Sequence, residues 1–240
     1  ICSARALQYT VHGPLGVNFM DEERLDLHKA VARAMLEVSG ALGASAMVLH
    51  AGVVAARPLP ELERLHAIER DALFETGEIA ARHGVRLALE NLFVEKPGRY
   101  TADPARLAEQ IAKVDHGSVC GTLDFSHAYI MTTLRGLDFA PAIEAFAPYV
   151  NHLHLHDSFG LPNTLGRFYT HAEQIAFGIG DIHLPMGWGD IDWGGILPGL
   201  RLRPATVMIV ELMPRHWSEI DEVAATARRF VEIVNRAQAS

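Results

Sequence analysis

The feature that most constrains the fold of this chain is a regular alternation of short β-rich apolar runs with longer helical stretches. This alternation predicts repeated βα units whose strands form a parallel sheet. Helix signals punctuate the stretches between the runs: Asp21 and Pro60 begin two of them, and Gly84 ends the second. Further helices are expected from Pro104 and from about Ile220. The expected strands are Leu7–His12, Ala46–His50, Arg86–Glu90, Val119–Phe125, Val150–His156 and Thr206–Leu212.

Two folds are built from such units, a TIM-type (β/α) barrel and a doubly wound open sheet. The length of 240 residues is close to the roughly 250 residues typical of the barrel. No glycine-rich phosphate fingerprint follows any expected strand, which disfavours the open sheet. Only six strands are expected, and the first of them begins shortly after Ile1. We therefore expect the first one or two βα units to be absent from this chain. We expect residues 1–240 to form one domain, in which the irregular stretch Ser158–Trp193 is a candidate functional loop.

Composition narrows the possible partners. The chain has 21 Lys and Arg against 29 Asp and Glu, a net charge of −8, so DNA stays possible but is not favoured. No apolar run is long enough to span a membrane. The two cysteines, Cys2 and Cys120, cannot form a disulfide framework and indicate a reducing, cytoplasmic compartment. We therefore expect a small-molecule partner and no membrane.

Every expected strand ends in a side chain that can bind a metal ion. In a parallel barrel the C-terminal strand ends lie on one face, so residues far apart in the chain converge on one cavity. Buried carboxylates and imidazoles are costly unless they are paired or neutralised by cations. A single histidine at a strand end is more often an ordinary hydrogen-bonded loop residue, but recurrence over six strands favours a shared metal site. These residues are His12, His50, Glu90, Asp124, His154 and Glu211.

Three more candidates lie near those strand ends. His127 follows Asp124 by three positions, and Asp181 and His183 form a D-x-H pair ahead of a glycine-rich turn. Nine nitrogen and oxygen ligands without a thiolate exceed the needs of one tetrahedral ion. The pattern therefore predicts two or three zinc or manganese ions.

The strand Val150–His156 carries an alternation of three histidines, His152, His154 and His156. Residues i and i+2 of a strand point to the same side, so all three would face the barrel interior. Spacing alone leaves open which of them binds metal.

The motifs around these residues resemble those of the xylose isomerase-like TIM barrels, and the ligand pattern is most similar to the endonuclease IV branch. Tyr-Thr-Val-His-Gly-Pro and Leu-His-Ala-Gly resemble its two histidine motifs, and Leu-Glu-Asn resembles its bridging glutamate strand. Leu-Asp-Phe-Ser-His-Ala-Tyr is similar to its Asp-x-x-His motif, and His-Leu-His-Asp-Ser selects His154 among the three histidines. Asp-Ile-His and Val-Glu-Leu resemble its last two motifs. The matched ligands are His12, His50, Glu90, Asp124, His127, His154, Asp181, His183 and Glu211.

The resemblance also implies how the ligands are shared. One ion would be held by His12, His50 and Glu90. A second would be held by Glu90, Asp124, His154 and Glu211, the set that corresponds to the single-metal site of sugar isomerases and epimerases in the superfamily. A third would be held by His127, Asp181 and His183. The resemblance is thus compatible with one to three divalent ions. In the family the first histidine motif stands on the third of eight strands, which again predicts absent N-terminal units.

Two reactions fit this set of residues. We favour a metal-dependent isomerase or epimerase of a small sugar or sugar phosphate, in which Glu90 and Glu211 transfer the proton and His127 holds a substrate hydroxyl. The alternative is an endonuclease IV-like zinc phosphodiesterase, of the AP endonuclease type or acting on a small phosphoester. Leu15 stands where DNA-repair members carry an aromatic side chain that probes the duplex, which opposes that alternative. A metal-stabilised binding protein is disfavoured because structural zinc sites are closed and compact. The expected substrate-binding residues are Arg215, His216, Arg167 and Trp188.

Overall fold

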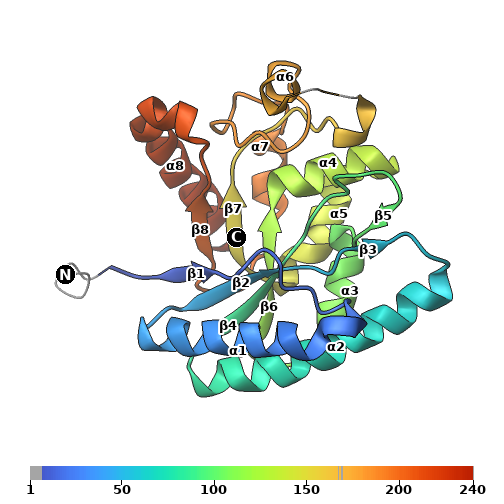
Figure 1. The fold of residues 1–240 in the computed structure, drawn as a ribbon. Coiled ribbons are helices and arrows are strands. Elements are labelled where there is room, and N and C mark those ends of the chain that lie inside the picture. Colours follow the sequence, from blue (N-terminus) through green and yellow to red (C-terminus); the bar gives the residue numbers. More distant parts are fainter. Residues whose placement is uncertain (1–6, 167, 169, 240) are drawn as a thin grey trace.

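The chain folds into a curled sheet of six parallel strands with helices on its outer face (Figure 1). The computed structural model describes residues 7–166, 168 and 170–239. The strands are β1 (Thr10–His12), β2 (Ala46–His50), β4 (Arg86–Glu90), β6 (Val119–Asp124), β7 (Val150–Leu155) and β8 (Val207–Val210), in the order β1-β2-β4-β6-β7-β8. Each strand is added beside the previous one without reversal of the order, unlike a doubly wound sheet. The predicted (β/α) barrel class is confirmed.

The helices after β1, β2 and β4 start near the predicted signals. Helix α2 (Leu59–Arg82) has proline in its first turn, and α3 (Pro104–Val114) is capped by Asp103, whose carboxylate accepts a hydrogen bond from the Arg106 backbone. Helix α1 (Leu25–Ala41) begins differently, with a 3-10 turn, η2 (Glu22–Arg24), ahead of it. Asp21 does not cap this helix because its carboxylate instead binds the side chains of Arg24 and His28.

Two helices between β6 and β7 were not expected from the sequence, α4 (Phe125–Arg135) and α5 (Phe139–Phe146). The first half of α4 is buried on all sides, so its sequence lacks the apolar and polar faces by which surface helices are recognised. Asp124 ends β6 and also caps α4, since its carboxylate accepts a hydrogen bond from the His127 backbone at 2.8 Å. The last helix, α8 (Ile220–Ala239), begins where expected and follows a 3-10 turn, η6 (Pro214–Glu219).

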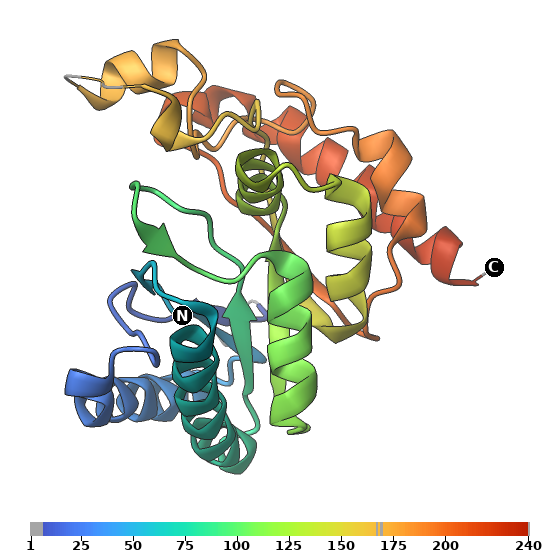
Figure 2. The ribbon, with the colours of Figure 1, turned by 90° about the vertical axis from the view of Figure 1, so that its right-hand side faces the viewer.

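The core lies between the sheet and its helical layer. Figures 1 and 2 show α1 and α2 side by side along the outer side of the sheet. Leu36, Leu73 and Leu107 of the first three helices are fully buried there. On β6, a Cβ at Gly121 would lie 2.5 Å from the Phe146 ring, so glycine is what lets α5 pack so closely against the strand.

Two further features lie beyond the strand ends. Strands β3 (Val54–Ala55) and β5 (Arg99–Tyr100) pair in an antiparallel ribbon, and we call residues 53–56 with 95–100 the strap. The stretch Ser158–Trp193 contains η4 (Asn163–Leu165), α6 (His171–Ala176) and the start of α7 (Trp193–Ile196), which runs into η5 (Leu197–Gly199). In the ranges described, no helix combines the length and apolar character needed to cross a membrane.

Candidate metal centre

The strand register brings the expected ligands to one rim of the sheet. His50 at the end of β2 pairs with Glu90 at the end of β4, and Asp124 at the end of β6 pairs with His154 of β7. Each pair therefore stands at the same height, although its members are about 30 to 40 residues apart in sequence. The convergence predicted from the sequence is what the fold produces.

Glu90 is the hub of the rim and is almost fully buried. Its Oε2 lies 3.2 Å from His12 Nε2 and 3.6 Å from His50 Nε2. Its Oε1 lies 3.1 Å from His154 Nδ1 and 3.3 Å from His127 Nδ1. One carboxylate thus faces four imidazoles, an arrangement suited to bridging two cations.

Asp124 forms a second centre beside it. Its Oδ2 lies 2.8 Å from His156 Nε2, 3.6 Å from His154 Nδ1 and 3.7 Å from His127 Nδ1. The backbone of Asp124 is held by Asn91, whose amide side chain both donates to its carbonyl and accepts from its N–H. This exchange fixes the end of β6 against the end of β4.

His152 and His154 of β7, and His156 directly after it, all point inward, as the strand period predicted, but to different depths. His152 lies deepest, with Nε2 3.2 Å from Thr10 Oγ1. His154 lies between two glutamates, with Nδ1 3.1 Å from Glu90 Oε1 and Nε2 3.5 Å from Glu211 Oε1. His156 also contacts the cluster, although the resemblance to the family motifs did not identify it as a ligand.

The D-x-H pair closes the cluster from the long segment after β7. Asp181 Oδ2 lies 2.7 Å from His183 Nε2 and 3.2 Å from His127 Nε2. Ser126 Oγ donates to Asp181 Oδ1. His183 has a φ of +44°, a left-handed backbone that non-glycine residues rarely adopt, and its ring stacks on that of His156 at 4.0 Å. The three groups proposed for a third ion are therefore neighbours, with His156 beside them.

The pKa shifts follow one electrostatic logic. Burial alone would lower the pKa of His154, but its interactions with Asp124 and Glu90 outweigh burial and raise that pKa to about 10. The same balance raises the pKa of His183 to about 9, through Asp181. Burial opposes ionisation of Glu90, yet the surrounding histidines hold the pKa of Glu90 well below its usual range. At neutral pH the cluster thus contains carboxylates compensated by positive imidazoles.

His50 and His152 differ from His154 and His183, since burial lowers the pKa of His152 to about 3 with a further contribution from His154. Burial lowers the pKa of His50 to about 4, despite the opposing attraction of Glu90. Its imidazole is therefore neutral at pH 7, which is the form that binds metal.

The donor set fits divalent ions. Within the described part of the chain, ligand atoms lie within 4.8 Å of one another in four triads: His12–His50–Glu90, Glu90–Asp124–His127, Asp124–His154–Glu211 and His156–His183–Glu211. The buried Nδ1 of His156 has no hydrogen-bond partner among the described residues, with Asp181 Oδ1 at 3.5 Å. Nitrogen and oxygen donors without sulfur suit zinc, manganese or magnesium.

The centre opens into a cavity of about 930 Å³, a volume typical of small-ligand sites. Most of the metal-ligand candidates line it, together with side chains from the loops after β1 and β4, from the strap and from the long segment. The lining residues that are not metal-ligand candidates include Leu15, Phe93, Lys96, Arg99, Asn163 and Gln174. None of these six was predicted to bind substrate.

None of the predicted substrate-binding residues that the structure describes lines the cavity. Trp188 and His216 contact each other, with ring centroids 5.5 Å apart, and neither lines the cavity. Arg215 is exposed on η6 and does not line it either. Arg167 falls outside the described residues. The position of each cavity-lining cation depends on the strap, which the sequence alone did not predict.

Asp157, which follows β7, anchors the segment that carries Asp181 and His183. Its Oδ1 accepts from the backbone of Ser158 at 2.9 Å and of Ile191 at 3.3 Å. Its Oδ2 accepts from the Gly187 backbone at 2.7 Å and from Trp193 Nε1 at 2.8 Å. The side chain is fully buried, so four donors converge on one desolvated carboxylate.

A family model described as xylose isomerase-like TIM barrel matches residues 1–233. No curated protein matches the chain. Among solved structures, a D-tagatose 3-epimerase-like protein has a TM-score of 0.73 at 21% identity, over 98% of this chain and 80% of that one. An IolI protein with a bound zinc atom has a TM-score of 0.68 at 22% identity, over 96% and 77%. An L-ribulose 3-epimerase has a TM-score of 0.63 at 14% identity, over 97% and 76%. At these identities the likeness concerns the fold.

Proposed function

The chain belongs to the xylose isomerase-like TIM barrel family, and from that membership and the geometry of the rim we propose that it is a divalent-metal-dependent isomerase or epimerase of a small sugar. The observation that carries the proposal is the placement of two glutamates on opposite nitrogens of one imidazole, Glu90 and Glu211 on either side of His154. The structural likeness to an L-ribulose 3-epimerase supports the same class of reaction.

The metal would be held by Glu90, Asp124, His154 and Glu211, with His12 and His50 completing a neighbouring position. When bound, a divalent ion polarises the carbonyl and hydroxyl oxygens of a sugar and lowers the barrier to losing the proton on the carbon between them. This assignment makes the glutamates ligands and also proton carriers.

Proton transfer is the task of the glutamates. One carboxylate takes the proton from the carbon next to the carbonyl, and the electron pair moves onto the carbonyl oxygen to give an enediolate. The other glutamate, in its protonated form, returns a proton to the opposite face of that carbon, which inverts it. Alternatively the proton goes to the former carbonyl carbon while the hydroxyl proton passes to the former carbonyl oxygen, which moves the carbonyl. His127, which lies 3.3 Å from Glu90 and 3.2 Å from Asp181, would hold a substrate hydroxyl.

The test is hydrogen exchange in D₂O. The protein is loaded with Mn²⁺ or Zn²⁺ and incubated with a panel of ketoses and aldoses, and deuterium at the carbon next to the carbonyl is followed by NMR. We expect exchange with at least one sugar, its loss in Glu211→Gln, and its retention in Glu219→Gln, a matched change on η6 outside the cluster. Absence of exchange with every sugar contradicts the proposal.

Phosphoester hydrolysis is the second candidate, and one observation favours it. The group formed by His127, His156, Asp181 and His183 lies beside the first centre and supplies donors for a further ion. Clustered ions generate hydroxide at neutral pH and stabilise the leaving oxygen. Metal analysis close to three zinc ions per chain, together with cleavage of a duplex that contains an abasic site, would establish this reaction instead.

A further inference from the structure

The cavity above the metal centre has a floor of carboxylates and imidazoles and a wall that carries two cations. Three carboxylates, Glu90, Asp181 and Glu211, line the floor, whereas Lys96 and Arg99 line the wall from the strap. Glu95 lines the same cavity and offsets one of the two positive charges. In a chain with a net charge of −8, this pair of cations is a local departure from the overall charge.

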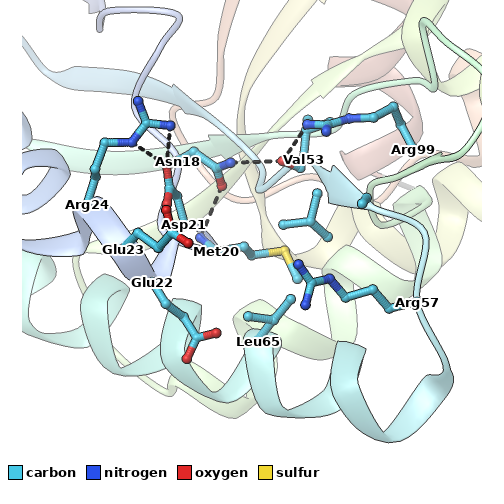
Figure 3. Close-up of a pocket in the computed structure, with 12 residues that line it drawn as sticks. Asn18, Met20, Asp21, Glu22, Glu23, Arg24, Val53, Arg57, Leu65 and Arg99 are labelled. Carbon is cyan, nitrogen blue, oxygen red and sulfur yellow. Dashed lines mark hydrogen bonds and ion pairs between the residues drawn. The ribbon is translucent and has the colours of Figure 1, made fainter.

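Lys96 and Arg99 have no carboxylate partner within the ranges that the structure describes. The arginines nearby are paired: Arg24 with Asp21, Arg57 with Glu61 and Arg64 with Glu22. The guanidinium of Arg99 instead donates one hydrogen bond from Nη2 to the Val53 carbonyl at 3.2 Å. Asn18 donates to the same carbonyl at 2.8 Å (Figure 3). Arg99 is therefore oriented by the backbone, and its remaining N–H groups are available to an anion.

The strap holds the backbone of both residues in place. Ala56 N donates to the Gly98 carbonyl at 2.7 Å, and Arg99 N donates to the Lys96 carbonyl at 3.3 Å. The hydroxyl of Tyr100, next to Arg99, lies 2.8 Å from Nε2 of the buried His66. A pair of cations on a braced ribbon pays less ordering entropy on binding than two side chains of a free loop.

We propose that Lys96 and Arg99 form an anion subsite that holds the charged end of the substrate, so that the substrate is an anionic sugar, a phosphate ester or a sugar acid. The inference rests on the proposed function for the identity of the rest of the molecule. The floor, rich in carboxylates, takes the hydroxyl and carbonyl end through the metal, and the wall takes the anion. Bidentate contact with a guanidinium and a point charge from an ammonium suit either anion.

The experiment measures binding to the zinc-loaded chain by titration calorimetry. The probes are D-fructose, D-fructose 6-phosphate, D-glucose, D-gluconate and inorganic phosphate. We expect one anionic sugar to bind at least about tenfold more tightly than its neutral counterpart, since charge-assisted hydrogen bonds are the strong ones. Preference for D-fructose 6-phosphate, with competition by inorganic phosphate, identifies a phosphate ester, and preference for D-gluconate identifies a sugar acid.

Variants assign the preference to the strap. Lys96→Ala/Arg99→Ala should abolish the preference, so that the anionic sugar binds no more tightly than its neutral counterpart. Arg57→Ala, which removes a paired arginine that lines only the neighbouring cavity of about 410 Å³, should leave it intact (Figure 3). Equal binding of neutral and anionic sugars, no binding of any anionic probe, or a preference that persists in the double variant overturns the proposal. Failure of the proposed function is seen separately, as absent deuterium exchange while the charge-dependent binding remains.

Discussion

Asp157 offers the sharpest test of how the fold supports the metal centre. Its carboxylate accepts four hydrogen bonds inside the protein and makes no contact with solvent. Asp157→Asn keeps the volume but turns an amide N–H₂ toward donors, so two of the four bonds are lost and two donors are orphaned. At about 1–3 kcal/mol for each unsatisfied buried group, the expected loss of unfolding free energy is about 2–6 kcal/mol.

A matched control lies in the same segment. Asp192 caps the short helix α7 through one exposed hydrogen bond to Gly195 N, so Asp192→Ala should cost only about 1 kcal/mol. Guanidinium unfolding followed by circular dichroism measures both variants against the parent chain, with the midpoint and the slope compared. If Asp157→Asn costs no more than Asp192→Ala, the four contacts are not what stabilises this segment.

Asp157→Asn should also weaken metal binding. The segment that Asp157 anchors carries Asp181 and His183. It is tightly packed, since a Cβ at Gly189 would lie 2.3 Å from the Ser158 carbonyl oxygen. If the segment packs less tightly, Asp181 and His183 are no longer held beside His127. We expect weaker zinc binding in Asp157→Asn, by competition with a chromophoric chelator, and unchanged zinc binding in Asp192→Ala.

Three further predictions follow from the cluster and its surroundings. In chelator-stripped protein, His154 and His183, whose pKa values are raised from 6.5 to about 10 and about 9, contribute stability that is fully present below pH 6.5 and lost as pH rises through those values. Zinc displaces the same protons, so zinc affinity should rise from pH 6 to 9 and the calorimetric enthalpy should vary with the buffer; a flat profile contradicts this. Removal of metal with EDTA should lower the Tm, and added zinc should restore it; an unchanged Tm would show that no ion binds the folded chain. Glu69→Ala leaves the buried His66 and the Gly52 N–H without their partner and should cost about 2–6 kcal/mol, at about 1–3 kcal/mol for each unsatisfied buried group, against about 0–1 kcal/mol for the exposed pair broken by Arg57→Ala, as urea midpoints will show.

The sequence alone determined the sheet and the ligand cluster. Strands Ala46–His50 and Arg86–Glu90 were predicted to the residue, because a parallel strand covered on both faces reads as a continuous apolar run with a polar end. Those polar ends had to meet, because all C-terminal ends of parallel strands lie on one face. Elements without such a pattern escaped prediction. Strands β3 and β5 have two residues each and show no period, and α4 is buried on too many sides to show an amphipathic one.

The tertiary structure decided which polar side chains share the cavity and what holds them there. His156 joins the centre because the long segment brings Asp181 and His183 to it, a contact between residues whose spacing in the chain carries no signal. Lys96 and Arg99 reach the cavity because β5 pairs with β3 within the strap, and Arg215 and His216 do not line it because η6 directs them elsewhere. Local sequence specifies secondary structure and burial, whereas the positions of loop side chains depend on long-range pairing that only the folded chain establishes.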